Sequence, residues 1–243
     1  MALTVVVTHA QTVLVPAENI LDKKDLHNGT YQMALFMEIE GKLEEAFSFT
    51  LTVNYTGKTL AIYTSMLMVF DSEDAATTDT SISDGNTFKP IYRSSNGQFH
   101  KMVINYGKNV SGYYYDKKTQ KRYKIKEHGG AFFDNYTYPY LLGLLPLTTG
   151  YKSEMAVFDF KPDNSTNLKT AHIDEVKSEV YVSELSGEHK VWKVKVYEEV
   201  TNDSFVYYID QETRRIWKID FVLHGTHMMF IDKEEDAKVK SSL

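Results

Sequence analysis

Apolar and polar residues alternate along much of the chain from Tyr31 onward. Between residues 47 and 55, aromatic and aliphatic side chains alternate with hydroxyl and amide side chains, which is the period of a strand with one buried face. Residues 31–39 follow the same period. Residues 60–70 are apolar at nearly every position, so we expect a central strand there with both faces covered.

The second half of the chain repeats this pattern in short runs joined by turns. The runs are residues 151–160, 168–174, 176–185, 190–199, 204–210, 214–221 and 226–231. Many short strands with tight turns are typical of an antiparallel sheet that wraps on itself. We therefore predict a mainly β protein whose large antiparallel sheet wraps into an open or closed barrel.

The stretch from Ala131 to Tyr151 fits neither a strand nor a full-length helix. Pro139 and Pro146 interrupt a dense group of leucines, and proline ends or bends a helix. We expect a short, proline-interrupted helical plug that packs against the curved sheet.

Residues 71–86 contain almost no large side chain, which predicts a mobile loop. Its acidic residues Asp71, Glu73, Asp74 and Asp79 lack the glycine and terminal glutamate of a calcium-binding loop. His224 and His227, if both lie on one strand, point to opposite faces. The sequence thus predicts no metal site.

Two segments, 114–125 and 208–219, align without gaps. Both place an Asp, at positions 116 and 210, three residues before a Thr. An Asp carboxylate in this position can accept backbone N–H groups of a tight turn. Convergent turn chemistry and an ancestral duplication both explain the similarity.

Composition restricts the function classes. With 243 residues, 42% hydrophobic, the chain can form one large β domain, which we place at residues 11–231 before a charged tail at 232–243.

A net charge of −6 argues against a nucleic-acid partner, and the absence of cysteine excludes disulfides. No apolar run approaches the roughly 20 residues of a spanning helix. Residues 1–10 fit either the remnant of a signal peptide or an edge strand.

One group of motifs resembles a known family. Four segments are similar to motifs of an exported bacterial family of unknown function. They are Phe133-Asp134, the run from Tyr140 to Tyr151, Trp192-Lys193-Val194 and the segment 207–215. That family is similar in fold to the lipoprotein carriers LolA and LolB and to the enzyme VioE, which share an unclosed β-barrel. The resemblance implies a large antiparallel sheet curved into an open or half barrel, and it implies export to the periplasm or envelope. Gly143 stands where the family often has arginine, so no role of that arginine carries over.

The favoured hypothesis is a non-enzymatic carrier that holds a lipid or another hydrophobic ligand on the concave face, with a possible envelope protein as partner. Flexible thioethers and rings suit irregular acyl chains. The candidate ligand contacts are Leu35, Met37, Phe49, Leu51, Met66, Met68, Tyr140, Leu141, Leu144 and Leu145. Arg214 and Arg215, adjacent on a predicted strand, are candidates for an anion contact at the rim.

Two alternatives remain open. A cell-surface module could bind protein or glycan through exposed tyrosines, of which Tyr113, Tyr114 and Tyr115 are consecutive. An enzyme on the VioE-like fold is the other, although no catalytic motif and no cofactor-binding motif is present.

Overall fold

The computed structural model describes residues 13–17, 20–69, 76–163, 166–183 and 186–233. The predicted signal-peptide remnant and most of the predicted tail lie outside these residues. The strands are β1 (Val13–Leu14), β2 (Gly29–Ile39), β3 (Lys42–Tyr55), β4 (Thr59–Met68), β5 (Thr77–Asp84), β6 (Pro90–Asn96), β7 (His100–Tyr106), β8 (Asn109–Asp116), β9 (Lys121–His128), β10 (Phe133–Asp134), β11 (Ser153–Phe158), β12 (Leu168–Ser183), β13 (Gly187–Glu198), β14 (Asp203–Asp210), β15 (Ile216–Leu223) and β16 (Thr226–Asp232). The helical segments are η1 (Lys23–Asp25), α1 (Tyr138–Leu141) and η3 (Leu142–Leu144).

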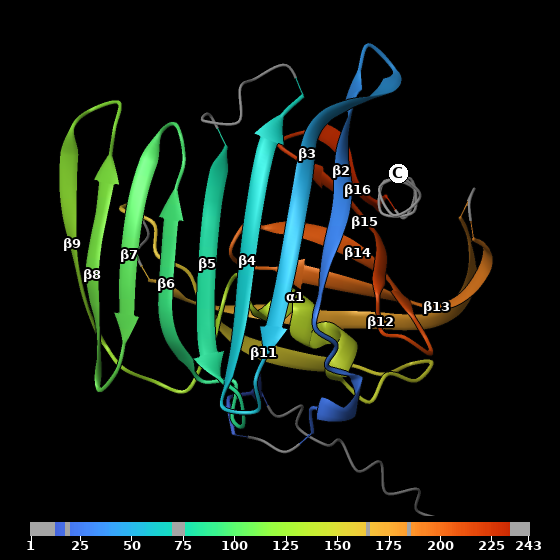
Figure 1. The fold of residues 1–243 in the computed structure, drawn as a ribbon, viewed down its shortest axis with the longest axis horizontal. Coiled ribbons are helices and arrows are strands. Elements are labelled where there is room, and N and C mark those ends of the chain that lie inside the picture. Colours follow the sequence, from blue (N-terminus) through green and yellow to red (C-terminus); the bar gives the residue numbers. More distant parts are fainter. Residues whose placement is uncertain (1–12, 18–19, 70–75, 164–165, 184–185, 234–243) are drawn as a thin grey trace, which may run out of the picture.

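All described strands belong to one sheet that does not close. Its order is β1-β11-β12-β13-β14-β15-β16-β2-β3-β4-β5-β6-β7-β8-β9, with β10 paired to β11 off this path. The pairs are antiparallel except those of β1 and β10 with β11. In Figure 1, β9 to β2 run side by side and β11 to β14 cross behind them. The prediction of a large, unclosed antiparallel sheet is confirmed.

Pairing between β16 and β2 makes the sheet continuous. Phe230 lies opposite Leu35 in this pair, so a strand near the end of the chain extends the first long meander. The sheet then folds over, and the inner faces of its two halves point toward each other (Figure 1). Apolar residues on the inner faces form the main core.

The helical plug lies in this core. Thr137 precedes α1, and Pro139 occupies the first turn, where its missing N–H costs no hydrogen bond. Leu141, Leu142, Leu144 and Leu145 are at most 1% exposed. Figure 1 shows α1 where the two layers overlap. The plug packs inside the curved sheet, as predicted.

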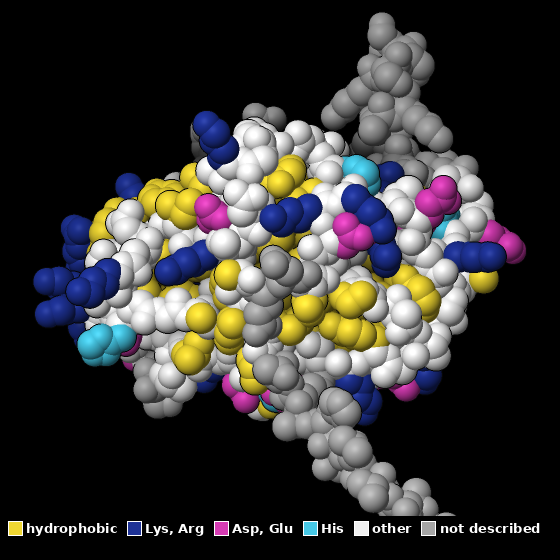
Figure 2. Space-filling model, turned by 90° about the horizontal axis from the view of Figure 1, so that it is seen from below, with side chains coloured by type: hydrophobic (Ala, Val, Ile, Leu, Met, Phe, Trp, Pro, Cys, Tyr) yellow, Lys and Arg dark blue, Asp and Glu magenta, His cyan; other side chains and the backbone are white. Residues whose placement is uncertain are grey.

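The free edge at β9 is strongly basic. Lys121, Arg122, Lys124 and Lys126 are exposed on this strand. Figure 2 shows Lys and Arg side chains gathered at this end of the molecule. Charged residues on an edge strand discourage pairing with another chain, so this edge is protected against aggregation.

Two predictions about local structure are wrong. Residues 77–84, predicted as a loop, form β5, whose inner positions Asp79, Ser81 and Ser83 are buried. Small side chains suffice there because Ser81 Oγ donates to Asp134 Oδ1 at 2.9 Å and lies 2.7 Å from the Thr137 hydroxyl. The runs 168–174 and 176–185 are not two strands, because β12 continues through a bulge between Ile173 and Glu175.

Candidate functional site

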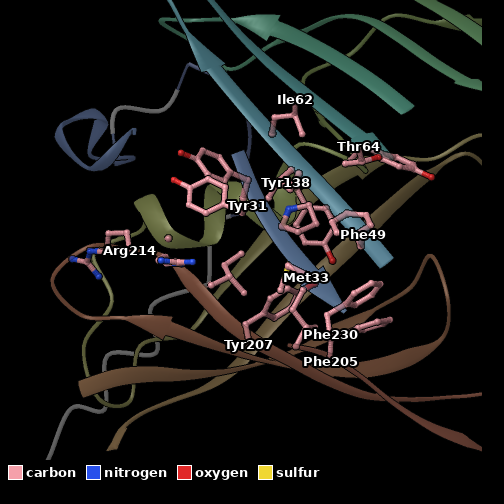
Figure 3. A pocket seen from close by; sticks show the side chains of 18 of the residues that line it. Tyr31, Met33, Phe49, Ile62, Thr64, Tyr138, Phe205, Tyr207, Arg214 and Phe230 are labelled. Carbon is pink, nitrogen blue, oxygen red and sulfur yellow. The ribbon is translucent and has the colours of Figure 1, made fainter. Parts of the chain in front are cut away.

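An apolar cavity of about 400 Å³ lies between the two halves of the sheet and the plug. Strands β2, β3 and β4 supply one wall, β14, β15 and β16 supply the other, and the plug contributes Tyr138, Pro139, Tyr140, Gly143 and Leu144. Figure 3 shows side chains from these elements converging on the cavity.

Strand alternation makes the walls apolar. Met33 and Phe49 are paired across β2 and β3, and both face the cavity. The ring of Phe230 lies 5.2 Å from that of Phe49 and 6.0 Å from that of Phe221. Tilted and stacked ring contacts at these distances are favourable, so the three rings that line the cavity also pack against one another in its wall.

A carboxyl group lines this mostly apolar cavity. Glu198 ends β13 on the same strand face as Val194 and Val196, and it is 6% exposed. Tyr138 donates a hydrogen bond to Glu198 Oε1, and the hydroxyl of Tyr207 donates to the same oxygen at 3.2 Å. The site therefore holds a buried glutamate between two tyrosines.

Burial changes the proton affinity of this group. It raises the pKa of Glu198 to about 7, the Asp203 carboxylate adds to the rise, and the hydrogen bond from Tyr207 opposes it. Burial and the adjacent Glu198 charge together raise the pKa of Tyr207 well above 10. Near neutral pH, Tyr207 thus remains a hydrogen-bond donor while Glu198 exchanges its proton.

Arg214 and Arg215 also line the cavity, but the prediction that they lie on a strand is wrong. They precede β15, and Arg214 has a φ of 60°, because the turn after β14 has to reverse the chain here. Arg214 Nε lies 3.3 Å from Asp25 Oδ2. Arg215 donates to both oxygens of Asp232, at 2.6 and 2.7 Å.

The predicted ligand contacts separate into two sets. Those that line the cavity are Phe49, Leu51, Tyr140 and Leu144. The others do not: Leu35, Leu141 and Leu145 are buried, Met37 and Met66 are half-buried, and Met68 is 43% exposed. Strand phase identified the inner face correctly in β3, but it does not tell where along a strand the cavity lies.

Sequence reasoning missed Glu198, Tyr138 and Tyr207. The alternation along β13 could have identified Glu198, since it lies on the same strand face as the buried Val194 and Val196. A carboxylate in the phase of buried valines is unusual, because burial of a charge is costly without a partner. The tyrosines carry no such signal.

Other predicted features lie apart from this cavity. His224 is in the turn before β16 rather than on a strand, and a ring nitrogen of His227 lies 2.8 Å from Asp220 Oδ1. Tyr113, Tyr114 and Tyr115 are each half-buried. In the described ranges, no three His, Asp or Glu side chains are grouped to hold a metal ion, and no helix there is long and apolar enough to cross a membrane.

Fold and cavity define a single-sheet, unclosed β protein with an internal apolar cavity. A family model described as a protein of unknown function, DUF3108, matches residues 27–232. The chain belongs to this family. The match includes all strands except β1, and thus every residue of the cavity except Asp25. A search of curated proteins found no relative.

Proposed function

We propose that this protein binds a hydrophobic or amphipathic small molecule, such as a lipid, inside the cavity and acts as a carrier for it. The observation that carries this proposal is the cavity of about 400 Å³ between the sheet halves. Its size is within the roughly 300–1,000 Å³ typical of small-molecule sites. Its aromatic and aliphatic walls favour an apolar occupant, because a ligand there buries apolar surface of its own.

The ionisable groups of the cavity can hold the head group of a ligand. Glu198 contacts two tyrosine hydroxyls, and the raised pKa of Tyr207 keeps that hydroxyl protonated near neutral pH. A general base beside Glu198 would need to lose its proton in this range. Arg214 and Arg215 are each held by a carboxylate. Tyr207 and the two arginines can therefore orient a ligand, and Glu198 is the group of this set that exchanges its proton near neutral pH.

The proposal includes export to the bacterial envelope. The resemblance to an exported family with a LolA-like unclosed barrel supports this location, and if the protein is exported, the absence of cysteine favours a bacterial envelope over a secreted domain stabilised by disulfides. The test is subcellular fractionation of the native protein followed by sequencing of its mature N-terminus. Recovery of an unprocessed chain in the cytoplasmic fraction would exclude export.

The binding proposal is tested first by mass spectrometry of organic extracts from the purified protein. A co-purified lipid or other apolar compound, at a stoichiometry near one, is the expected result. Binding is then measured by titration with the fluorescent dye Nile red, which emits strongly only in apolar surroundings.

Two variants on β15 form a matched pair for this titration. Ile219 lines the cavity, whereas Val222 is 49% exposed on the opposite face of the strand. Ile219→Trp fills the cavity, so we expect dye binding to weaken at least about tenfold. A tenfold change in affinity corresponds to the burial of roughly two methylene groups. Val222→Trp should bind like the unmodified protein. Equal binding by both variants would place the ligand outside this cavity.

A further inference from the structure

The two hydrogen bonds to Glu198 both end on one oxygen. Tyr138 and Tyr207 donate to Oε1, and none of the residues that the structure describes donates to Oε2. Glu198 lines the cavity, and only 6% of the residue is exposed. Oε2 is not enclosed by protein atoms, so it is accessible from the cavity, and a carboxylate oxygen there without a protein donor can accept a hydrogen bond from a ligand.

The charges around Glu198 leave it without a counter-ion. The carboxylate of Asp203 adds negative charge nearby, and Tyr138 and Tyr207 are neutral donors. No Lys, Arg or His nitrogen within the described ranges forms a salt bridge with Glu198. The two cavity arginines instead pair with Asp25 and Asp232. A positive charge is therefore missing from this part of the cavity.

We propose that Glu198 Oε2 binds the protonated amine of an amphipathic ligand whose apolar body occupies the rest of the cavity. The inference rests on the proposed binding function and specifies its ligand class. The tyrosines fix the carboxylate by holding Oε1, which leaves Oε2 oriented for a single ligand donor. An ammonium group supplies the absent positive charge, and a charge-assisted hydrogen bond is stronger than a neutral one.

This arrangement links binding to pH. The ammonium group binds ionised Glu198, whereas the pKa near 7 leaves the carboxyl protonated in acid. Binding of the amine then releases a proton, and affinity falls by up to about tenfold for each pH unit below 7. Alkylamines remain protonated throughout this range, because their pKa resembles the roughly 10.4 of lysine.

The test compares three probes of equal chain length: decylamine, decanol and decanoate. Their dissociation constants are measured by isothermal titration calorimetry on the full chain at pH 5.5, 7 and 8.5. At pH 8.5 we expect decylamine to bind at least about tenfold more tightly than decanol. The preference should decrease toward pH 5.5.

Glu198→Gln keeps the shape of the side chain and removes its charge. The ratio of decylamine to decanol affinity should fall to about one and lose its pH dependence, with decanol binding in the same variant showing that the cavity persists. The matched control is Glu199→Gln, which changes the neighbouring exposed residue and should retain the ratio. Tyr207→Phe removes a hydrogen bond that lowers the pKa of Glu198, so its binding curve should shift to higher pH.

The outcomes separate the two proposals. If none of the three probes binds, the proposed carrier function fails. Binding of decanol as tight as that of decylamine, or a preference for the amine that survives in Glu198→Gln, overturns the role of Glu198 and leaves the carrier function standing. Tightest binding of decanoate also overturns it and moves the head-group contact to Arg214.

Discussion

The guanidinium of Arg93 lies 3.1 Å from the carboxylate of Asp159 in the protein interior, where Arg93 is 4% exposed and Asp159 is 4% exposed. Arg93 comes from β6, and Asp159 follows β11 at the far end of the strand order. The same guanidinium lies 3.8 Å from Asp134 and 4.2 Å from the ring centre of Tyr136. This buried ion cluster joins segments that the sheet order keeps far apart.

Removing the cation of this cluster should destabilise the protein strongly. Arg93→Met leaves Asp134 and Asp159 buried without their positive partner, which costs about 3–5 kcal/mol of the free energy of unfolding. Arg122→Met, at the exposed β9 edge, is the control and should cost less than about 1 kcal/mol. Urea denaturation measures both values. A loss below 1 kcal/mol for Arg93→Met would show that the cluster contributes nothing net.

Glu198 should make stability depend on pH. Its folded pKa is about 7 against 4.5 for an exposed glutamate, so the native state binds this proton more tightly than the unfolded chain. The resulting stabilisation is complete below pH 4.5 and is lost as the pH rises through 7, a change on the order of 3 kcal/mol. Glu198→Gln cannot ionise, so its stability relative to the unmodified protein should increase between pH 5 and 8. Parallel denaturation curves for the two proteins across this range would contradict the raised pKa.

The two similar turns, which follow Asp116 and Asp210, should differ in how much stability the protein loses when their Asp is mutated. Asp210 accepts the backbone N–H groups of Glu212 and Thr213, and its other oxygen accepts the indole N–H of Trp217 at 3.1 Å. Because Asp210 is buried, Asp210→Ala leaves these donors unpaired and should cost about 3 kcal/mol.

Asp116 provides the comparison, since it accepts the N–H groups of Lys118 and Thr119 in an otherwise similar turn. This turn is exposed, so water replaces the carboxylate in Asp116→Ala and the cost should be smaller. Thermal unfolding of both variants gives the order of the two effects. An equal loss in both would mean that turn geometry matters more than burial.

Gly112 should tolerate no side chain. A Cβ added here would lie 1.9 Å from the carbonyl oxygen of Val103 on the neighbouring strand, so Gly112→Ala forces β7 and β8 apart. We expect a loss of about 3 kcal/mol or more. At Gly107 the nearest atom is 3.7 Å away, and Gly107→Ala should change stability by less than about 0.5 kcal/mol. Circular dichroism during denaturation distinguishes the two, and a stable Gly112→Ala protein would contradict this backbone contact.

Much of the fold was predictable because it depends on local patterns. Alternation between residues 47 and 55 defines a strand, and the prolines at 139 and 146 limit the plug to a short helical segment. The failure at β5 has a physical cause. That strand is held by backbone pairing and by hydrogen bonds such as the one from Ser81 to Asp134, which composition does not register.

The sequence by itself determined most of the strand pattern, a large antiparallel sheet that wraps on itself and the buried leucine plug, because each follows from the spacing of apolar side chains and prolines along the chain. Only the tertiary structure decided which inner-face residues line a cavity. That choice depends on where β2 to β4 and β14 to β16 diverge, and it brings Glu198, Tyr138 and Tyr207 together from three separate segments. Distances between segments far apart in the chain arise from strand order and sheet curvature, and residue spacing does not encode them.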